Sequence, residues 1–421
     1  MTQLFERKGG AQKVALIAGL AALLIGVGLG PEMASASAAQ AQSGQTRVMA
    51  PRFEVDPMWP KPLPNHWILG SVIGVSVDAD DHIWVIHRGT QTVDDNEKRL
   101  DSKTANCCAV APPVLEFDQA GNLLRHWGGP GAGYEWPTGA HAITVDYRGN
   151  VWLGGNGIDD SHILKFTKDG RFLMQLGKKG ARRKPGAPVG EGVYGATADY
   201  AGGSNDSVSF GRVAKIIVDP TTNEAYVADG YLNKRVAVLD ADTGALKRYW
   251  GGSGNKPDDT PLGRYDPSAP PSQQFRNPVH CAMLSNDRLL YVCDRVSNRI
   301  QVFTPEGKLV KQGFYDTNTQ GSGAVWDIAF SKDPQQRYIY VADGTNQQIK
   351  VIDRQSLALL TTFGDGGRQP GQFYGVHSIA TDSKGNLFTT ETWEGKRVQR
   401  FVYKGLGSVP RVQGIVWPPR R

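Results

Sequence analysis

The sequence has few cysteines, no marked excess of one charge and, beyond its first thirty residues, no long hydrophobic run. Four cysteines in 421 residues are too few for a disulfide-stapled scaffold. The net charge is only +6, from 47 basic and 41 acidic residues spread along the chain, so we expect no nucleic-acid partner. A hydrophobic fraction of 40% excludes wholesale disorder. Glycine is abundant, with 51 residues or about 12% against a usual ~7%, which indicates many turns.

The single long apolar run lies close to the N-terminus. A basic segment at residues 7–13 precedes 17 apolar residues at 14–30, and small residues with Ala-x-Ala spacing follow at 34–41. This layout is typical of a secretory signal peptide, which we expect to span residues 1–42. An uncleaved membrane anchor is the alternative, because the run is just long enough to span a bilayer. The sequence therefore predicts a secreted or periplasmic protein with no membrane span in its mature form.

The rest of the chain repeats one pattern of alternating apolar residues six times. Each copy holds two hairpins, in which an apolar strand, a short polar turn and a second apolar strand follow one another. The second hairpins, of which the sixth is truncated, begin at Val114, Ile163, Val236, Ile300, Ile349 and Val398. Six four-stranded units predict an all-β fold, a six-bladed β-propeller over residues 70–404. Residues 43–69 are then an N-terminal extension, and residues 405–421 a C-terminal tail.

Two of the copies also resemble a known repeat, and two segments fall outside the pattern. Residues 226–240 and 291–303 are similar to NHL repeats, so the propeller is expected to be of the NHL type. Residues 89–113 form a polar insertion, and residues 177–211 are glycine-rich and locally basic. We expect both insertions to be long surface loops over one mouth of the propeller.

Three histidines share one phase of the repeat. Counting back five residues from the first-turn aspartate, or its equivalent, gives Ile73, His141, Ala214, His280, Trp326 and His377. Equivalent positions of a propeller lie on a ring around its axis, and these begin the innermost strands, which line the channel. The histidines of the second, fourth and sixth blades should therefore converge on one axial point.

Three converging imidazoles leave a coordination position open, as catalytic zinc sites do. Iron and copper also accept imidazole ligands, so both stay open as alternatives to zinc. The remaining histidines show no such phase. Of these, His66 and His87 are candidates to support the ligands, and we expect His82, His126 and His162 at the surface.

Polar side chains gather where the second strand of a blade ends. Arg88, Tyr231 and Arg295 occupy this place in the first, third and fourth blades, at the rim of the mouth that holds the histidines. Arginine can hold a carboxylate through two hydrogen bonds. A tyrosine beside a cation and a metal ionises more easily and can act as a base. Two other interpretations stay open, a salt bridge of Arg295 with an aspartate of a neighbouring blade and simple packing of Tyr231 in the channel.

In this order, the motifs resemble a known enzyme family. The phased histidines, HRG at 87–89, DGYxNxR at 229–235 and DRxxNRIQ at 294–301 are together similar to peptidylglycine α-amidating lyase, itself a six-bladed propeller. The resemblance covers roughly residues 70–402. It implies cleavage of the C–N bond of a peptidyl-α-hydroxyglycine to a peptide amide and glyoxylate. The substrate is then a peptide or small molecule with a C-terminal carboxylate.

The same resemblance implies a role for each site residue. The three phased histidines would hold zinc, and Tyr231 would take the proton from the substrate hydroxyl. Arg88 would stabilise Tyr231 or the developing charge, and Arg295 would bind the substrate carboxylate. In the family an aspartate that serves a structural calcium follows the third histidine, whereas here Ser378 does, so the calcium is not carried over. The loop at 90–108 also differs, and loops over the mouth shape substrate choice.

The four cysteines form two groups, one in the hairpin of the fourth blade and one in the insertion at 89–113. Cys281 and Cys293 lie on the two strands of one hairpin, where an exported protein can form a cross-strand disulfide or keep two buried thiols. Cys107 and Cys108 are adjacent, so they either form a vicinal disulfide or pair elsewhere. The sequence does not decide between these alternatives.

A second class of function fits the same fold. An NHL-type propeller can be a scaffold that holds a protein or peptide on its open face, with a metal that only braces the channel. A scaffold needs neither Tyr231 nor two arginines beside a three-coordinate metal, and this favours the lyase. A lactonase-type propeller is disfavoured, because it requires a calcium site lined by carboxylates and asparagines. Because a propeller closes on itself, we expect a monomer.

Overall fold

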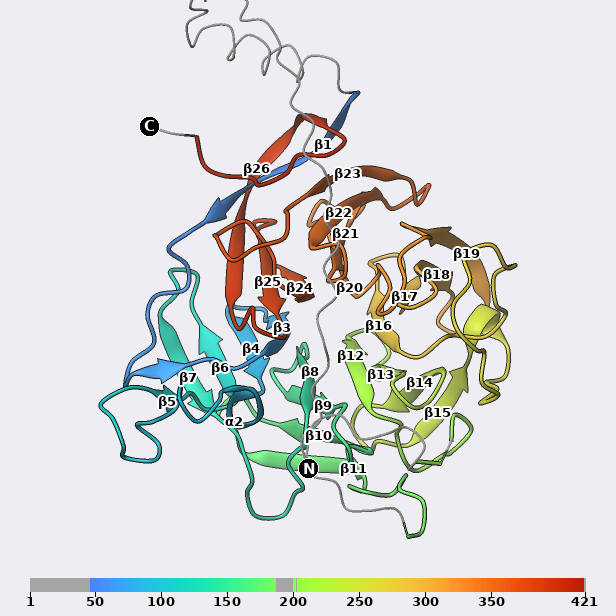
Figure 1. The fold of residues 1–421 in the computed structure, drawn as a ribbon. Coiled ribbons are helices and arrows are strands. Elements are labelled where there is room, and N and C mark those ends of the chain that lie inside the picture. Colours follow the sequence, from blue (N-terminus) through green and yellow to red (C-terminus); the bar gives the residue numbers. More distant parts are fainter. Residues whose placement is uncertain (1–45, 187–199, 202, 420–421) are drawn as a thin grey trace, which may run out of the picture. The chain divides into compact units, whose positions relative to one another are not determined.

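The computed structural model describes residues 46–186, 200–201 and 203–419, and the expected signal peptide lies outside them. The described part contains six four-stranded sheets arranged as blades around an axis (Figure 1), which confirms the predicted six-bladed β-propeller. Within these residues, no helix combines the length and the apolar character needed to cross a membrane.

Five blades are built from strands in chain order from the axis outwards. The first blade contains β3 (Val72–Val77), β4 (Ile83–His87), β6 (Val114–Phe117) and β7 (Leu123–Trp127). The second contains β8 (Ala140–Val145), β9 (Val151–Gly155), β10 (His162–Phe166) and β11 (Phe172–Gly177). The third blade contains β12 (Val213–Asp219), β13 (Glu224–Asp229), β14 (Arg235–Asp240) and β15 (Leu246–Trp250). The fourth contains β16 (Val279–Leu284), β17 (Leu290–Asp294), β18 (Arg299–Phe303) and β19 (Leu309–Phe314). The fifth contains β20 (Asp327–Phe330), β21 (Tyr338–Asp343), β22 (Gln348–Asp353) and β23 (Leu359–Phe363).

The burial of each strand follows from its place in the blade. All six residues of β13 are buried, because neighbouring blades cover both faces of a middle strand. The outermost strand β19 alternates between half-buried and exposed residues, as a strand with one solvated face does. Buried strands such as β13 therefore appear in the sequence as continuous apolar runs. Outermost strands such as β19 appear as an alternation of apolar and polar residues.

The first-turn aspartate of the repeat holds its hairpin together. The Oδ1 atom of Asp146 accepts hydrogen bonds from the backbone N–H groups of Arg148 (2.9 Å) and Asn150 (2.8 Å). Its Oδ2 atom accepts one from Nε1 of Trp152 at 2.9 Å. This carboxylate satisfies donors that the tight turn leaves unpaired, which explains why the turn carries an aspartate.

A buried ion pair recurs where the second strand meets the third. An acidic side chain ends the second strand, a basic one lies at or near the start of the third, and the carboxylates are fully buried. The pairs are Asp229–Arg235, Asp294–Arg299, Asp343–Lys350 and Glu391–Arg397. These pairs fix the loops at the mouth where Tyr231 and Arg295 lie.

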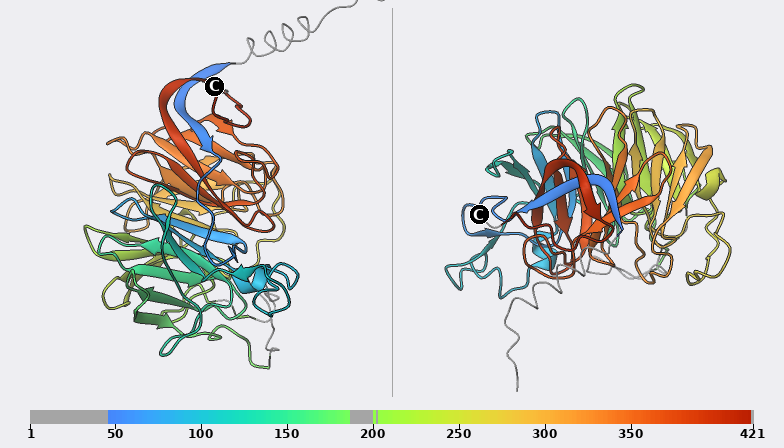
Figure 2. Two further views of the ribbon diagram at one scale, coloured as in Figure 1. Left: turned by 90° about the vertical axis from the view of Figure 1, so that its left-hand side faces the viewer. Right: turned by 90° about the horizontal axis from the view of Figure 1, so that it is seen from above.

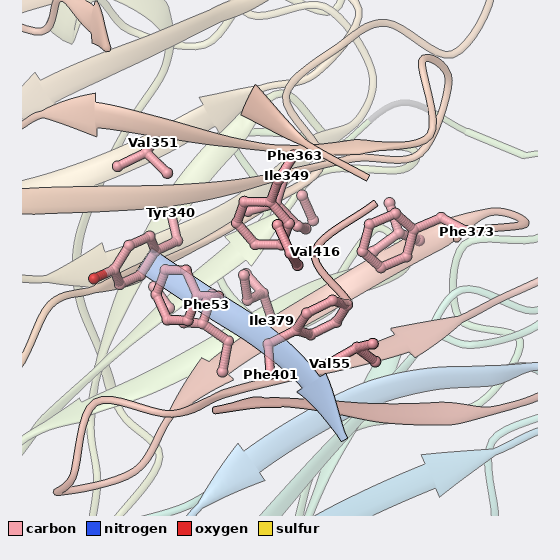
Figure 3. Close-up of a cluster of buried hydrophobic side chains, with 14 residues drawn as sticks. Phe53, Val55, Tyr340, Ile349, Val351, Phe363, Phe373, Ile379, Phe401 and Val416 are labelled. Carbon is pink, nitrogen blue, oxygen red and sulfur yellow. The ribbon is translucent and has the colours of Figure 1, made fainter. Parts of the chain in front are cut away.

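The sixth blade takes its outer strand from the beginning of the described chain. Its strands, from the axis outwards, are β24 (Val376–Thr381), β25 (Leu387–Glu391), β26 (Val398–Pro410) and β1 (Arg47–Asp56). β1 pairs with β26 in antiparallel fashion, and the two strands lie side by side in both views of Figure 2. Phe53 and Val55 of β1 pack against Tyr340, Phe363 and Phe401 between the fifth and sixth blades (Figure 3).

This pairing corrects the expected limits of the propeller. The sequence pattern placed residues 43–69 before the fold and residues 405–421 after it. In the structure ten residues of the first segment form β1, and β26 continues to Pro410. β1 supplies the strand that the truncated sixth copy lacks. It was missed because its partner lies at the other end of the sequence rather than in an adjacent hairpin.

The insertion between the second and third strands of the first blade, β4 and β6, forms short elements. It holds the helix α2 (Gly89–Thr92) and the strand β5 (Ala109–Val110), which pairs in parallel with β2 (Trp67–Ile68). A short 3-10 turn, η2 (Gly252–Gly254), follows the third blade.

Candidate metal centre

The six phased positions, which lie on a ring around the axis, are called the ring positions. A β-bulge lies at this position in five of the six innermost strands. The pairing register shifts around the residues Ile73, His141, Ala214, His280 and His377. A bulge leaves its extra residue out of the ladder and re-aims the side chain. The local backbone therefore turns the phased residues toward the channel. In the fifth blade the ring residue Trp326 directly precedes β20.

The structure brings the three phased histidines together at the axis. Nitrogen atoms of His141, His280 and His377 lie within 4.8 Å of one another, and all three residues are buried. Each Nδ1 atom lies against a backbone oxygen of the next blade's ring residue. The contacts are His141 with Ala214 at 2.8 Å, His280 with Trp326 at 2.5 Å and His377 with Ile73 at 2.7 Å.

These contacts fix the tautomer of each imidazole. A carbonyl oxygen only accepts hydrogen bonds, so each Nδ1 carries the proton and each Nε2 keeps its lone pair. A hydrogen bond of this kind also orients a ligating imidazole and raises its basicity. The six phased positions thus alternate around the channel between a histidine side chain and a carbonyl oxygen that orients it.

Burial keeps the imidazoles neutral. Desolvation, above all, lowers the pKa of all three histidines well below 6.5. The nearby positive charges of Arg88 and Arg295 lower the pKa of His377 further. Neutral imidazole is the form that coordinates a metal, so the site is ready for one near neutral pH.

The hydroxyl of Tyr231 lies beside this cluster. It is 2.9 Å from Nε2 of His141 and 3.0 Å from Nε2 of His280. A hydroxyl has a single proton, so it can donate to only one of these two nitrogens. The other nitrogen then faces the hydroxyl oxygen with a lone pair on each side. A cation between these atoms would remove the repulsion, so the donor set fits a metal ion.

The two rim arginines are held differently. Arg295 stacks on the ring of Trp326, with 4.5 Å from its guanidinium carbon to the ring centroid, and its Nη1 lies 3.4 Å from the Tyr231 hydroxyl. Its buried Nε has no hydrogen-bond partner among the described residues. The nearest acidic side chain in sequence, Asp294, pairs with Arg299 at 2.8 Å instead. This leaves Arg295 positioned but with an unmatched donor.

Arg88 is anchored to the second blade. Its Nε donates to the backbone oxygen of Ala140 at 2.9 Å, and its Nη2 donates to Oδ1 of Asn156. Ala140 directly precedes His141, so this arginine is tied to the strand that carries the first of the three phased histidines. The sequence reasoning did not identify Asn156, which lies in a loop with no repeat phase.

A buried ion pair lies one residue beyond the ring. The Oδ2 atom of Asp327 accepts hydrogen bonds from Nζ of Lys215 at 2.7 Å and from Oγ of Ser378 at 2.6 Å. The two charges compensate each other inside the channel. Sequence reasoning missed Lys215 and Asp327, although their place directly after the ring residues Ala214 and Trp326 was a usable signal.

The other histidines lie outside this cluster. His162 was expected at the surface but is 1% exposed, and its Nε2 lies 2.6 Å from the backbone oxygen of Glu135. That expectation was wrong because His162 begins β10, a middle strand. His87 is buried against backbone groups of Gly70 and Pro112. His66 and His126 are exposed.

A second acidic and histidine group lies at the turn of the first blade. His82, Asp78 and Glu116 have possible ligand atoms within 4.8 Å of one another. Lys168 already pairs with Asp78 at 2.7 Å, and Arg125 pairs with Glu116 at 2.5 Å. Protein cations therefore occupy the place that a metal would need.

Both cysteine pairs are disulfides in the structure. Cys281 and Cys293 face each other across β16 and β17. They lie between His280 and the end of β17 that precedes Arg295. Cys107 and Cys108 form a vicinal disulfide in the loop after α2. Disulfides are typical of proteins that work in an oxidising compartment.

Comparison with curated proteins finds distant relatives. The chain is 24% identical over 248 residues to peptidyl-glycine alpha-amidating monooxygenase A of Xenopus laevis, and 25% identical over 252 residues to peptidylglycine alpha-amidating monooxygenase of Rattus norvegicus. Each match covers 58% of this chain and only 22% of the relative. The probable peptidyl-alpha-hydroxyglycine alpha-amidating lyase pgal-1 of Caenorhabditis elegans is 20% identical over 342 residues, which are 77% of this chain and 80% of that protein.

Solved structures show similarity at low identity, and no protein-family model matches the chain. Virginiamycin B lyase from Staphylococcus aureus is 16% identical, with a TM-score of 0.44 over 87% of this chain and 89% of that one. A streptogramin B lyase is 14% identical, with a TM-score of 0.45 over 85% of this chain and 98% of that one.

Proposed function

We propose that this chain is a zinc-dependent lyase that cleaves the C–N bond of a peptidyl-α-hydroxyglycine or a similar carbinolamide. The observation that carries the proposal is the meeting of three neutral imidazoles with the hydroxyl of Tyr231 at the axis. The distant similarity to the lyase of Caenorhabditis elegans and to the amidating monooxygenases supports the same reaction. Zinc fits because this cleavage neither oxidises nor reduces the substrate, although imidazoles also suit iron and copper.

The ligands would be the three phased histidines, His141, His280 and His377. When bound there, zinc supplies Lewis acidity that lowers the pKa of an oxygen group beside it. The protein supplies the rest, which is a fixed tautomer for each imidazole, a proton carrier and two cations at the rim.

Tyr231 is the proposed proton carrier. The guanidinium of Arg295, 3.4 Å from the phenol oxygen, favours the ionised form of the tyrosine. The phenolate takes the proton of the substrate hydroxyl and returns it to the departing amide nitrogen. The O–H electron pair becomes the C=O bond of glyoxylate, and the C–N pair stays on nitrogen. One carbinolamide thus gives one amide and one glyoxylate, with no other reactant.

The two arginines are the proposed partners of the substrate's negative charges. Arg295 is the carboxylate anchor, because it is held flat on Trp326 and its Nε lacks a partner among the described residues. Arg88, tied to the backbone beside His141, would stabilise the charge that develops on the hydroxyl oxygen. The two disulfides support an exported protein, so we propose that the reaction takes place outside the cytoplasm.

Metal analysis of three proteins tests the metal centre. We expect about one zinc per chain in the wild type, none in His280→Ala, and full content in His126→Ala, which removes an exposed histidine. Glyoxylate release from N-acetyl-α-hydroxyglycine should follow the zinc content. Zinc retained in His280→Ala would contradict the site. If the wild type binds no metal even after zinc addition, the scaffold interpretation replaces the lyase.

The variant Tyr231→Phe separates proton transfer from metal binding. It should keep its zinc, because the phenol is not among the proposed ligands, and should lose about 10²–10⁴-fold in turnover. Steady-state glyoxylate release and metal content measured on the same sample check both statements. Full activity in this variant would show that another group moves the proton.

A further inference from the structure

A large cavity lies between the first and second blades, next to the proposed metal centre. Its volume is about 850 Å³, which is within the range of small-molecule and peptide side-chain sites. Arg88 and Ala140 form part of its wall, and Ala140 directly precedes the ligand His141. A ligand in this cavity therefore approaches the same arginine that faces the metal centre.

The walls of the cavity carry two tryptophan rings and four proline rings among their lining residues. They include Trp67, Trp136, Pro112, Pro113, Pro130 and Pro137. Both tryptophans are braced by other rings, Trp67 edge-on to His126 at 4.7 Å and Trp136 edge-on to Tyr134 at 6.4 Å. Proline has no backbone N–H group to offer, so this surface binds chiefly through flat apolar contacts.

The charges around the cavity are mostly positive. Arg88, Lys98 and Lys179 line it, against the single carboxylate of Asp101. An oxygen of that carboxylate already accepts a hydrogen bond from the backbone N–H of Val110. A lysine or arginine side chain would therefore enter an apolar space among like charges, which is unfavourable.

The loop that closes the cavity is fixed to the rest of the fold. Its strand β5 pairs with β2, and Gln91 of α2 donates to the backbone oxygen of Thr138 on the facing wall. Glu97 of the same loop forms an ion pair with Lys396 of the sixth blade at 2.8 Å. The cavity is thus preformed, which reduces the entropy lost when a ligand binds.

We infer that this cavity binds the peptide part of the substrate and selects an apolar or aromatic residue, rather than a basic one, beside the bond that is cleaved. The inference rests on the proposed function and specifies its substrate class. Arg88 is the residue common to the cavity wall and the metal centre, so the residue preceding the hydroxylated glycine is the part of the substrate that reaches the rings.

Filling the cavity tests this selection. Thr90 lies exposed on α2 and lines the cavity, so Thr90→Trp places a large ring there without disturbing the core. The measured quantity is the ratio of kcat/KM for N-acetyl-Phe-α-hydroxyglycine to that for N-acetyl-α-hydroxyglycine. We expect the ratio to fall at least about tenfold in Thr90→Trp. Thr104→Trp, exposed in the same loop but not in the cavity wall, should keep the wild-type ratio.

A charge variant tests the discrimination against basic residues. Lys179→Gln keeps a donor near the backbone oxygen of Trp136 and removes one positive charge. The preference for N-acetyl-Phe-α-hydroxyglycine over N-acetyl-Lys-α-hydroxyglycine should weaken several-fold in this variant. A wild-type preference for the lysine substrate would overturn the inference.

The outcomes separate this inference from the proposed function. Glyoxylate release with an unchanged phenylalanine ratio in Thr90→Trp would overturn the cavity's role and leave the lyase standing. If no α-hydroxyglycine substrate is cleaved, the lyase fails, and calorimetry with N-acetyl-phenylalaninamide decides the cavity alone. Binding that is lost in Thr90→Trp would support the site, whereas absent or unchanged binding would overturn it.

Discussion

At the scale of single residues, the channel depends on backbone groups as much as on side chains. Ala214 offers no functional side chain, yet its carbonyl oxygen fixes the tautomer of His141. Ile73 serves His377 in the same way. Both carbonyls belong to residues that a β-bulge leaves out of the ladder, which frees them to accept a hydrogen bond from the imidazole N–H. The positions without histidine therefore contribute to the site through their backbone oxygens.

A buried histidine outside the ring makes stability depend on pH. Burial lowers the pKa of His87 from 6.5 to about 4, against the opposing hydrogen bond to the Pro112 oxygen. The unfolded chain therefore takes up a proton near pH 6.5 that the folded protein refuses until about pH 4. Stability is fully present above pH 6.5 and falls as the pH drops through this window, by up to about 3 kcal/mol for this one group.

Urea unfolding of the wild type and of His87→Gln at pH 7 and pH 4.5 measures this contribution. The other buried histidines act equally in both proteins, so they cancel in the difference. The variant should lose less stability on acidification than the wild type. Equal losses would show that His87 is not neutral in the folded protein.

At the scale of elements, the sequence predicted the blades and the common phase of the three histidines. It did not predict the β-bulges that orient these side chains toward the channel. Counting five residues back from the first-turn aspartate, or its equivalent, found His141, His280 and His377, because this spacing along the first strand is the same in every blade. The bulges at these positions leave no mark in an apolar pattern, since an extra residue looks like ordinary spacing. Lys215 and Asp327 were not predicted, because the residues that follow the phased positions share no residue type from blade to blade. The loops at the mouth differ in sequence from blade to blade, so the repeat pattern does not predict their structure.

The hairpin of β16 and β17 is stapled beside the proposed metal ligand. Its disulfide joins Cys281 to Cys293, which are 12 positions apart. Closing a loop of about this size lowers the entropy of the unfolded chain and so stabilises the fold by about 3 kcal/mol. The double variant Cys281→Ala with Cys293→Ala should lose about 2–4 kcal/mol in urea unfolding without reductant. It should also bind zinc more weakly, because His280 precedes the first of these cysteines.

The second disulfide is the matched control. Cys107 and Cys108 are adjacent, so their bond closes no loop of the chain. Replacing both with serine should cost little stability and should leave zinc binding unchanged. An equal loss in the two double variants would mean that the staple does not stabilise the hairpin in the way described.

At the scale of the whole molecule, one strand closes the ring of blades. β1 lies on β26, and its side chains Phe53 and Val55 fill the space between the fifth and sixth blades (Figure 3). Phe53→Ala should lower the free energy of unfolding by about 3–5 kcal/mol, measured by urea denaturation. Arg52→Ala, on the exposed face of the same strand, should change it by about 1 kcal/mol or less. Similar losses in the two variants would place the closure elsewhere.

A ribosome makes the chain from its N-terminus, so the contacts that close the propeller form only late in synthesis. The ion pair of Asp56 with Arg400 joins residues 344 positions apart, and the contact of His377 with the Ile73 oxygen spans 304. Contacts between such distant residues form late and slowly. The last imidazole and the carbonyl that orients it meet only after the sixth blade has emerged. The proposed three-histidine site is therefore complete only once the sixth blade has been made, and a product that ends before His377 lacks one of its imidazoles.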